Sequence, residues 1–264
     1  ARQLGHFNKQ AAVITNGNKK PLYLVMTGVV LEGYVDVSGS YPVQMGELLM
    51  DKSELEFDDI NRGDEQVQEL HIYNNGTRMY QPNLMHLPPY LTAKMTPSRL
   101  SAGQAGTMKV TLNSTKLSDY GLTQSTVYLA SNPGDKVSSD NEIAVSAVLL
   151  PSFEGIGDAQ RQYAPKMVLT QEKIDVQLDK KKKSYTIGIS NHGRSELDIS
   201  SLQLFTTGLK VSLGKSRLQA GESTKLKITA IAEELRKVKT RPRILMITND
   251  PSKPKVVITL NMKN

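Results

Sequence analysis

The chain has 264 residues, a length that accommodates about two domains. Apolar residues make up 38% of it and cysteine is absent, so the chain has a globular composition without disulfides, thiolate metal sites or a cysteine nucleophile. The net charge of +7 is divided unevenly, because residues 1–34 carry +3, residues 35–152 carry −6 and residues 153–264 carry +10. Aromatic residues make up only 5%, which argues against nucleic-acid binding. An acidic middle and a basic end favour docking to a partner through complementary charge.

Residues 1–31 have the pattern of two paired strands. Leu24, Met26 and Val30 lie at alternating positions, which is typical of a half-buried strand. The segment aligns with the last two strands of the repeat described below, so we expect a hairpin from the end of a preceding, truncated repeat. A lone hairpin is at best marginally stable in water, and its apolar face is therefore expected to find a partner surface.

A period of 117 to 118 residues runs through the rest of the chain. The hexapeptide Ser98–Gly103 returns 118 residues later as Ser216–Gly221, with five of six positions identical. The tripeptide Asn74–Gly76 returns 117 residues later as Asn191–Gly193. A constant period across separate markers indicates a domain duplication.

Each copy alternates apolar and polar residues in about seven short strands. Residues 108–112 of the first copy and residues 226–230 of the second show this pattern. Turn residues separate the strands, and Asn75-Gly76 is expected to supply a positive φ. We therefore predict an all-β protein, in which residues 35–152 and 163–264 form tandem immunoglobulin-like, seven-stranded β-sandwiches preceded by the hairpin.

Two smaller features lie outside this strand pattern. A short helix is expected at residues 232–239, where acidic and basic side chains have helical spacing. Residues 151–165 form a long linker between the two copies. The angle between the sandwiches is expected to vary unless Phe153, Ile156 and Tyr163 pack into a neighbour.

Turn and strand motifs carry a family resemblance. The first copy has Leu55, Phe57, Ile60 and Gly63, then Ile72 and Asn74 to Gly76, then Leu100, Ala102 and Gly103, then Ser131 and Asn132; the second answers with Asn191, Gly193, Leu218, Gly221 and Thr248 to Asp250. This pattern resembles the Hydin-type (ASH-like) immunoglobulin-like domains, relatives of the major sperm protein and of PapD-type chaperones. It is similar in particular to a bacterial subfamily of unknown function, found in tandem arrays on exported, often lipid-anchored proteins of the outer membrane and cell envelope. The cysteine pair common in that subfamily is absent, and alanine replaces the turn proline at Ala102 and Ala220.

The most concentrated charge lies at Lys180, Lys181, Lys182 and Lys183. The alignment of the copies places these residues at a hairpin tip. Four adjacent ammonium groups are typical of a solvated turn. The functional alternative is contact with an anionic partner such as an acidic protein face, lipopolysaccharide phosphates or lipid headgroups, where each lysine contributes about 1 kcal/mol. These four lysines are the candidate partner-binding residues.

Other candidate chemistry is better explained by structure. Residues 214–216 (Gly-Lys-Ser) lack the spacing and the following helix of a phosphate-binding loop. The acidic residues among positions 58–65 lack a calcium-loop pattern and indicate a solvated turn. His71, His86 and His192 are scattered, and no Gly-x-Ser-x-Gly motif accompanies them. No catalytic residue, metal ligand or cofactor is predicted.

These observations favour a non-catalytic structural or interaction module of the bacterial cell envelope. Such a module, in the periplasm or on the cell surface, would bind protein partners through sheet edges and charged faces. The basic C-terminal copy is a candidate contact to an anionic surface, and neither nucleic acid nor a transmembrane segment is expected. One alternative is a periplasmic chaperone that lends a strand to an incomplete client, and no long apolar edge strand with a basic pair indicates it. Another is a carbohydrate-binding module, for which Tyr73, Tyr80, Tyr90 and Tyr128 are too scattered.

Overall fold

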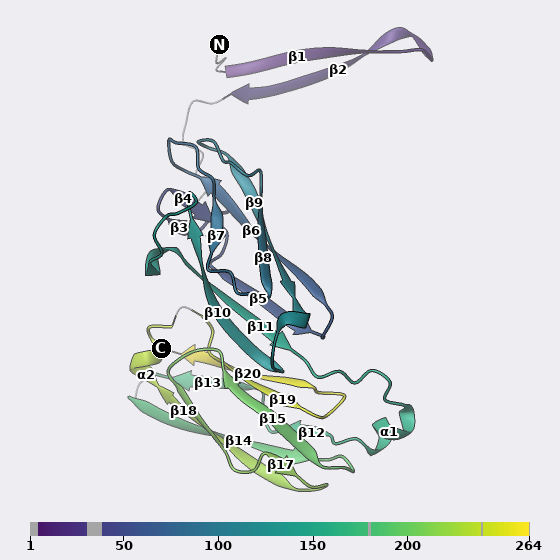
Figure 1. The fold of residues 1–264 in the computed structure, drawn as a ribbon, viewed down its shortest axis with the longest axis vertical. Helices are drawn as coiled ribbons and strands as arrows, with labels where there is room; N and C mark the ends of the chain where they lie inside the picture. Colours follow the sequence, from purple (N-terminus) through teal and green to yellow (C-terminus); the bar gives the residue numbers. More distant parts are fainter. Residues whose placement is uncertain (1–4, 31–38, 179–180, 239, 264) are drawn as a thin grey trace. The chain divides into compact units, whose positions relative to one another are not determined.

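The structure is a computed structural model that describes residues 5–30, 39–178, 181–238 and 240–263. It divides into two units, residues 1–40 and residues 41–264. The first unit holds a β-hairpin and the second holds two β-sandwiches, each made of two packed sheets (Figure 1). The predicted all-β fold with tandem immunoglobulin-like sandwiches is therefore confirmed. In the described part of the chain, the helices are all too short to cross a membrane.

The hairpin pairs β1 (Gly5–Thr15) with β2 (Asn18–Val30) in antiparallel register. Directly opposed residues share a face, and the register pairs Val13 with Leu22 and Ala11 with Leu24. One face of the hairpin is thus mainly apolar, and Leu22 and Leu24 remain more than half exposed. The predicted hairpin is present. Its origin in a preceding repeat stays a prediction.

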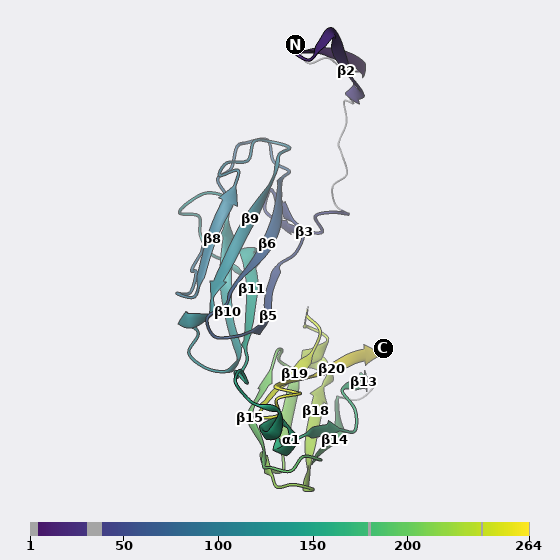
Figure 2. The same ribbon diagram turned by 90° about the vertical axis from the view of Figure 1, so that its right-hand side faces the viewer.

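The first sandwich is formed by nine strands among the described residues. They are β3 (Val43–Met45), β4 (Leu48–Met50), β5 (Glu54–Ile60), β6 (Glu65–Asn74), β7 (Asn83–Met85), β8 (Leu91–Thr96), β9 (Ala105–Asn113), β10 (Gly121–Ala130) and β11 (Glu142–Leu149). One sheet has the order β3-β4-β6-β9-β8 and the other β5-β11-β10-β7, and Figure 2 shows β6, β9 and β8 side by side in the first of these. Short 3-10 helices at Ser114–Lys116 and Ser139–Asn141 link neighbouring strands.

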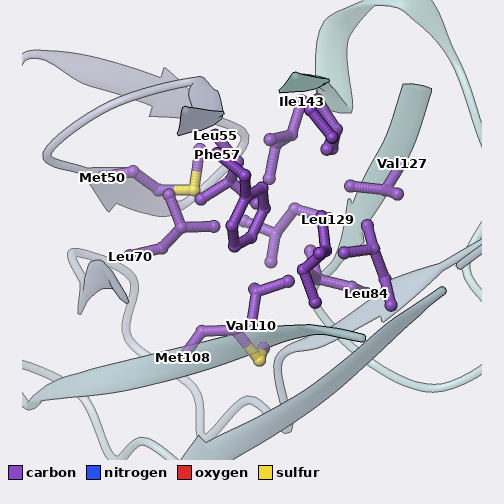
Figure 3. Packing of buried hydrophobic residues seen from close by; sticks show 14 of the residues in the cluster. Met50, Leu55, Phe57, Leu70, Leu84, Met108, Val110, Val127, Leu129 and Ile143 are labelled. Atoms are coloured by element: carbon purple, nitrogen blue, oxygen red, sulfur yellow. The ribbon is translucent and has the colours of Figure 1, made fainter. Parts of the chain in front are cut away.

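The core of this sandwich follows from the alternation seen in the sequence. Successive side chains of a strand point to opposite faces, so every second residue enters the space between the sheets. Figure 3 shows Phe57 of one sheet near Leu70 and Met108 of the other, with Val127 and Ile143 closing the same cluster. All five side chains are at most 1% exposed.

The second sandwich repeats this plan. Its strands are β12 (Met167–Leu169), β13 (Lys173–Gln177), β14 (Lys182–Asn191), β15 (Leu197–Leu204), β16 (Leu209–Leu213), β17 (Arg217–Leu218), β18 (Ser223–Ile231), β19 (Arg243–Thr248) and β20 (Lys255–Lys263). The sheets have the orders β12-β14-β18-β16 and β13-β20-β19-β15-β17. Each sandwich has nine strands among the described residues where seven were predicted, because alternation did not reveal β3 and β7 in the first sandwich or β15 and β17 in the second.

Two short α-helices accompany the strands. The helix α2 (Ala232–Leu235) lies within the predicted residues 232–239, of which Lys239 is outside the described residues. The helix α1 (Asp158–Tyr163) lies in the linker and was not predicted. It has only six residues, too few for the repeating apolar pattern that reveals longer helices.

A buried asparagine organises the same turn in both sandwiches. Asn74 donates through Nδ2 to the carbonyls of Arg78 (2.7 Å) and Leu100 (2.9 Å), and its Oδ1 accepts from Gly76 N (2.9 Å). Asn191 makes the matching bonds in the second copy, at 2.8, 3.0 and 2.9 Å. The prediction that Asn75-Gly76 supplies a positive φ is wrong, because Gly76 has no positive φ and the buried amide shapes the turn instead.

Candidate functional site

The two sandwiches meet at an apolar joint. The joint consists of Leu122, Val148 and Leu150 from the first sandwich and Phe205, Leu245, Ile247 and Val257 from the second. Leu245 is fully buried and Ile247 is 1% exposed, although both point away from the core of their own sandwich. Burying such side chains removes apolar surface from water and stabilises the contact between the sandwiches.

Ion pairs surround the joint. The guanidinium of Arg243 makes a bidentate contact with the Glu56 carboxylate and lies 4.1 Å from the centroid of the Phe205 ring. Lys255 Nζ lies 2.9 Å from Asp59 Oδ1 and 3.3 Å from Asp58 Oδ1. The acidic residues of the first sandwich therefore pair with cations of the second, which is a specific use of the charge division seen in the sequence.

The side chain of Gln203 extends the joint, because it forms hydrogen bonds to the backbone of β10 as a neighbouring strand would. The Gln203 side chain accepts a hydrogen bond from Leu122 N (2.7 Å) and donates one to Leu122 O (2.9 Å). Gly121 has a φ of +97°, and a Cβ at this position would overlap the Gln203 amide. A glycine is thus needed for the close approach.

The three apolar side chains singled out in the linker lie outside the joint. Phe153, Ile156 and Tyr163 belong to none of the apolar clusters of the described residues, and Tyr163 is 60% exposed. The expectation of a variable angle rested on these three side chains. The joint instead forms from residues of β10, β11, β19 and β20 together with Leu150 and Phe205, which directly follow β11 and β15, and we expect it to hold the two sandwiches in one arrangement.

Beside the joint, part of the β10 edge has no partner strand. β10 pairs with β11 from Gly121 to Tyr128 but with β7 only from Tyr128 to Ala130. The backbone groups of alternate residues point to the same side of a strand, so Gln124 and Thr126 direct their N–H and C=O groups as Leu122 does, away from β11. Among the described residues, no strand pairs with this side of Gln124 and Thr126.

Two adjoining pockets lie beside this open edge and extend across β10, β11 and β5 between the two sandwiches. One pocket of about 680 Å³ is lined by Gln124 to Thr126, Ala144, Val145, Leu204 to Leu209 and Glu234. A second pocket of about 630 Å³ shares Thr126 and Ala144 with it and adds Glu54, Asp140 and Glu142. Every charged residue that lines the two pockets is acidic. We call this double pocket the acidic groove.

Two polar groups in the acidic groove are in unfavourable surroundings. Burial, reinforced by the charge of Glu56, raises the pKa of Glu54 above its usual value, and Arg243 lowers it by a smaller amount. The buried Thr206 hydroxyl has no hydrogen-bond partner among the described residues. A ligand with a positive charge and hydrogen-bonding groups would compensate both.

The lysine cluster is only partly described. Lys180 lies outside the described residues, and Lys181 precedes β14. Lys182 and Lys183 open β14 and, as neighbours in a strand, point to opposite faces. The predicted hairpin tip is wrong, because β13 and β14 belong to different sheets. Lys183 Nζ donates to Gln177 Oε1 at 2.6 Å, so this lysine is engaged within the chain.

Other residues singled out in the sequence have structural surroundings. His71 Nδ1 lies 3.3 Å from the Thr107 hydroxyl, and the His86 ring packs edge-on against Tyr128. Asp64 accepts from the backbone N of Asn61 at 2.8 Å, which is the predicted turn. No group of three or more metal-binding side chains occurs within the residues that the structure describes.

Comparison with known families supports the fold. Residues 165–263 match the family model described as HYDIN/CFA65/VesB-like, Ig-like domain. The second sandwich is therefore similar to this family, and the resemblance to Hydin-type domains is confirmed. A search of curated proteins found no match to the chain.

Solved structures include one with a shared fold. A protein of unknown function from Porphyromonas gingivalis W83 is 21% identical with a TM-score of 0.64, and the match covers 83% of this chain and 100% of that chain. The YadV chaperone is 12% identical with a TM-score of 0.27, covering 81% of this chain and 97% of that chain. The VesB protease of Vibrio cholerae is 12% identical with a TM-score of 0.30, covering 70% and 63%.

Proposed function

We propose that this chain is a non-catalytic interaction module of the bacterial cell envelope, in the periplasm or on the cell surface. Its binding site is the acidic groove, where an extended segment of a partner protein adds to the open edge of β10. The observation that carries the proposal is the unpaired backbone of Gln124 and Thr126 between the two stretches of β10 that are already satisfied. The envelope location is supported by the resemblance to the bacterial Hydin-type subfamily.

Strand addition suits this edge for a physical reason. An unpaired edge presents alternating N–H and C=O groups, and an extended peptide satisfies them with main-chain hydrogen bonds. Gln203 already makes such bonds to one residue of β10, which supports the proposal. Residues 204–209, from the end of β15 to the start of β16, also line this groove.

The charge of the groove defines the partner's chemistry. Glu54, Asp140, Glu142 and Glu234 line it without a basic residue among the lining side chains. Lysine or arginine at alternate positions of a bound strand would face these carboxylates. We therefore propose a partner segment that is extended and basic. The lysine cluster at Lys180, Lys181, Lys182 and Lys183 remains a separate candidate contact to an anionic surface.

A designed peptide tests the proposal directly. The probe is a terminally blocked octapeptide of alternating lysine and valine, added to the full chain and followed by NMR and amide hydrogen exchange. The proposal predicts saturable binding and slower exchange of the Gln124 and Thr126 amides. Main-chain pairing protects these amides, whereas loose charge attraction does not.

Charge-matched variants provide the control. The double variant Glu142→Lys with Glu234→Lys should weaken peptide binding by about tenfold or more, the size of one charge-assisted hydrogen bond. Glu65→Lys with Glu154→Lys makes the same change in net charge outside the groove and should have little effect. Unprotected amides at Gln124 and Thr126 in the bound state, or equal losses in both double variants, would refute the proposal.

A further inference from the structure

A pocket of about 390 Å³ lies at one end of the second sandwich, away from the lining residues of the acidic groove. Three chain segments line it: the end of α1 with the residues that lead into β12, the turn after β14, and the turn between β19 and β20. Its basic side chains are Arg161, Lys166, His192 and Arg194. We call these four residues the basic corner.

Backbone contacts bring the basic corner together. His192 N donates to Lys166 O at 2.8 Å, and Arg194 N donates to Ala164 O at 3.3 Å. A Cβ at Gly193 would overlap the backbone of Ala164 and Lys166, so glycine is required for this close approach. The cationic side chains therefore meet because two backbone segments are held against each other.

No acid inside the pocket neutralises the basic corner. Asp250 is the acidic residue among the lining side chains, and it is only 1% exposed. Its carboxylate accepts from Met167 N at 2.8 Å and from Ser252 N and Oγ at 2.8 and 2.7 Å. These bonds hold the adjoining turn to β12. Within the described residues, the three permanent cations of the basic corner form no ion pair.

The first sandwich shows that the fold does not require these charges. Its matching turn has Glu47, Asn75 and Thr77 where the second has Lys166, His192 and Arg194, and Asn75 N donates to Glu47 O at 3.0 Å in the same way. The Glu47 carboxylate is itself engaged, since it accepts a hydrogen bond from the Tyr80 hydroxyl. The same backbone geometry is thus compatible with an acidic or a basic corner.

We infer that the basic corner is a binding site for a phosphate group carried on a small polar molecule or a lipid headgroup. Two guanidinium groups and an ammonium group supply directed, charge-assisted hydrogen bonds of the kind that phosphate oxygens accept. The pocket volume falls within the range of about 300–1,000 Å³ that is usual for small-ligand sites. It therefore has room for a group attached to the phosphate. This site is independent of the acidic groove and would remain if that proposal failed.

The test replaces three residues of the basic corner with the residues at the matching positions of the first sandwich. The corner-swap variant combines Lys166→Glu, His192→Asn and Arg194→Thr, which are the residues that the matching turn of the first sandwich already accommodates. The probes are inorganic phosphate, glycerol 3-phosphate, and phosphatidylcholine vesicles with or without phosphatidylglycerol. The native chain should bind a phosphate-bearing probe, and the corner swap should weaken that binding by at least about tenfold, the size of one charge-assisted hydrogen bond.

A control separates the site from general charge. Lys225→Glu with Lys227→Gln removes the same three units of charge from β18 and should leave probe affinity within about twofold of the native value, because screening limits the effect of distant surface charges. Binding of the soluble phosphates identifies a soluble source, and binding that requires phosphatidylglycerol identifies a lipid source. Native-like binding by the corner swap, or an equal loss in the control variant, would overturn the inference. Thermal unfolding confirms that each variant is folded.

Discussion

The two sandwiches carry the same turn and opposite charges beside it. Asn74 and Asn191 make three matching hydrogen bonds in the two copies, and Asn191 accepts a further one from Lys166 N at 3.2 Å. The adjoining position is Glu47 in the first copy and Lys166 in the second. The comparison separates two kinds of residue, because the buried amide is needed by the fold whereas the exposed charge is free to differ. Binding should therefore be sought where the copies differ.

The largest expected effect concerns the buried asparagine that the two copies share. Asn74→Ala removes three side-chain hydrogen bonds and Asn191→Ala removes four, and both leave buried backbone groups unpaired. Each variant should lose about 2–4 kcal/mol of unfolding free energy. Urea unfolding measures this loss. A loss below about 1 kcal/mol in either variant would show that the two turns are not equivalent in their role.

The next prediction compares a side chain of the joint with a side chain of a sandwich core. Leu245→Ala should cost about 2–4 kcal/mol and broaden the distribution of distances between spin labels placed in the two sandwiches. Leu260→Ala is the matched control, since Leu260 is buried in the core of its own sandwich. It should cost a similar free energy and leave the distances unchanged. Equal broadening in both variants would contradict a specific role for the joint.

The duplicated scaffold could be predicted because its signals are local. Alternation identifies strands, and the constant period relates Asn74 to Asn191. The joint was not predicted, because an alternating pattern of apolar and polar residues implies that one face of each strand is exposed to solvent. The unbroken apolar run from Ile244 to Ile247 was an available signal, since it indicates a strand buried on both faces.

The candidate sites were harder to predict. The acidic groove depends on β7 being shorter than its neighbour β10, and a strand edge leaves no mark in the residue pattern of β10. The basic corner needs Arg161 and Arg194, which are 33 positions apart, to meet through backbone contacts. The lysine cluster was conspicuous in the sequence because its residues are adjacent, which is a property of the chain and not of the folded surface.

A smaller effect is expected when the first corner is made basic. Glu47→Lys, Asn75→His and Thr77→Arg together should create weak phosphate binding in the first sandwich. Affinity should stay below that of the second sandwich, because no counterpart of Arg161 lines this turn among the described residues. The same change should lower the pKa of Tyr80, because its hydrogen bond to Glu47 raises that pKa. Phosphate titration and ultraviolet titration of the tyrosines measure the two effects.

The smallest effect concerns Glu54 in the acidic groove. Its raised pKa means that the folded state favours the protonated carboxyl, so the stabilising contribution is present at low pH and is lost as pH rises through the folded pKa. Glu54→Gln should therefore stabilise the chain at pH 7 by a few tenths of a kcal/mol, since solvent screens this partly exposed group. The difference in melting temperature should narrow toward pH 4. A stabilisation that grows as the pH falls would contradict this assignment.

The most direct test of the central claim compares the two corners within one molecule. Inorganic phosphate is titrated into the isotopically labelled full chain, and the amide resonances of both turns are followed by NMR. The account predicts saturable shifts at Gly193 and Arg194 and none at Gly76 and Thr77, although the two turns share their hydrogen bonds. Equal shifts at both turns, or no shift at Gly193 and Arg194, would contradict the claim that the copies share a scaffold and differ in what their corners bind.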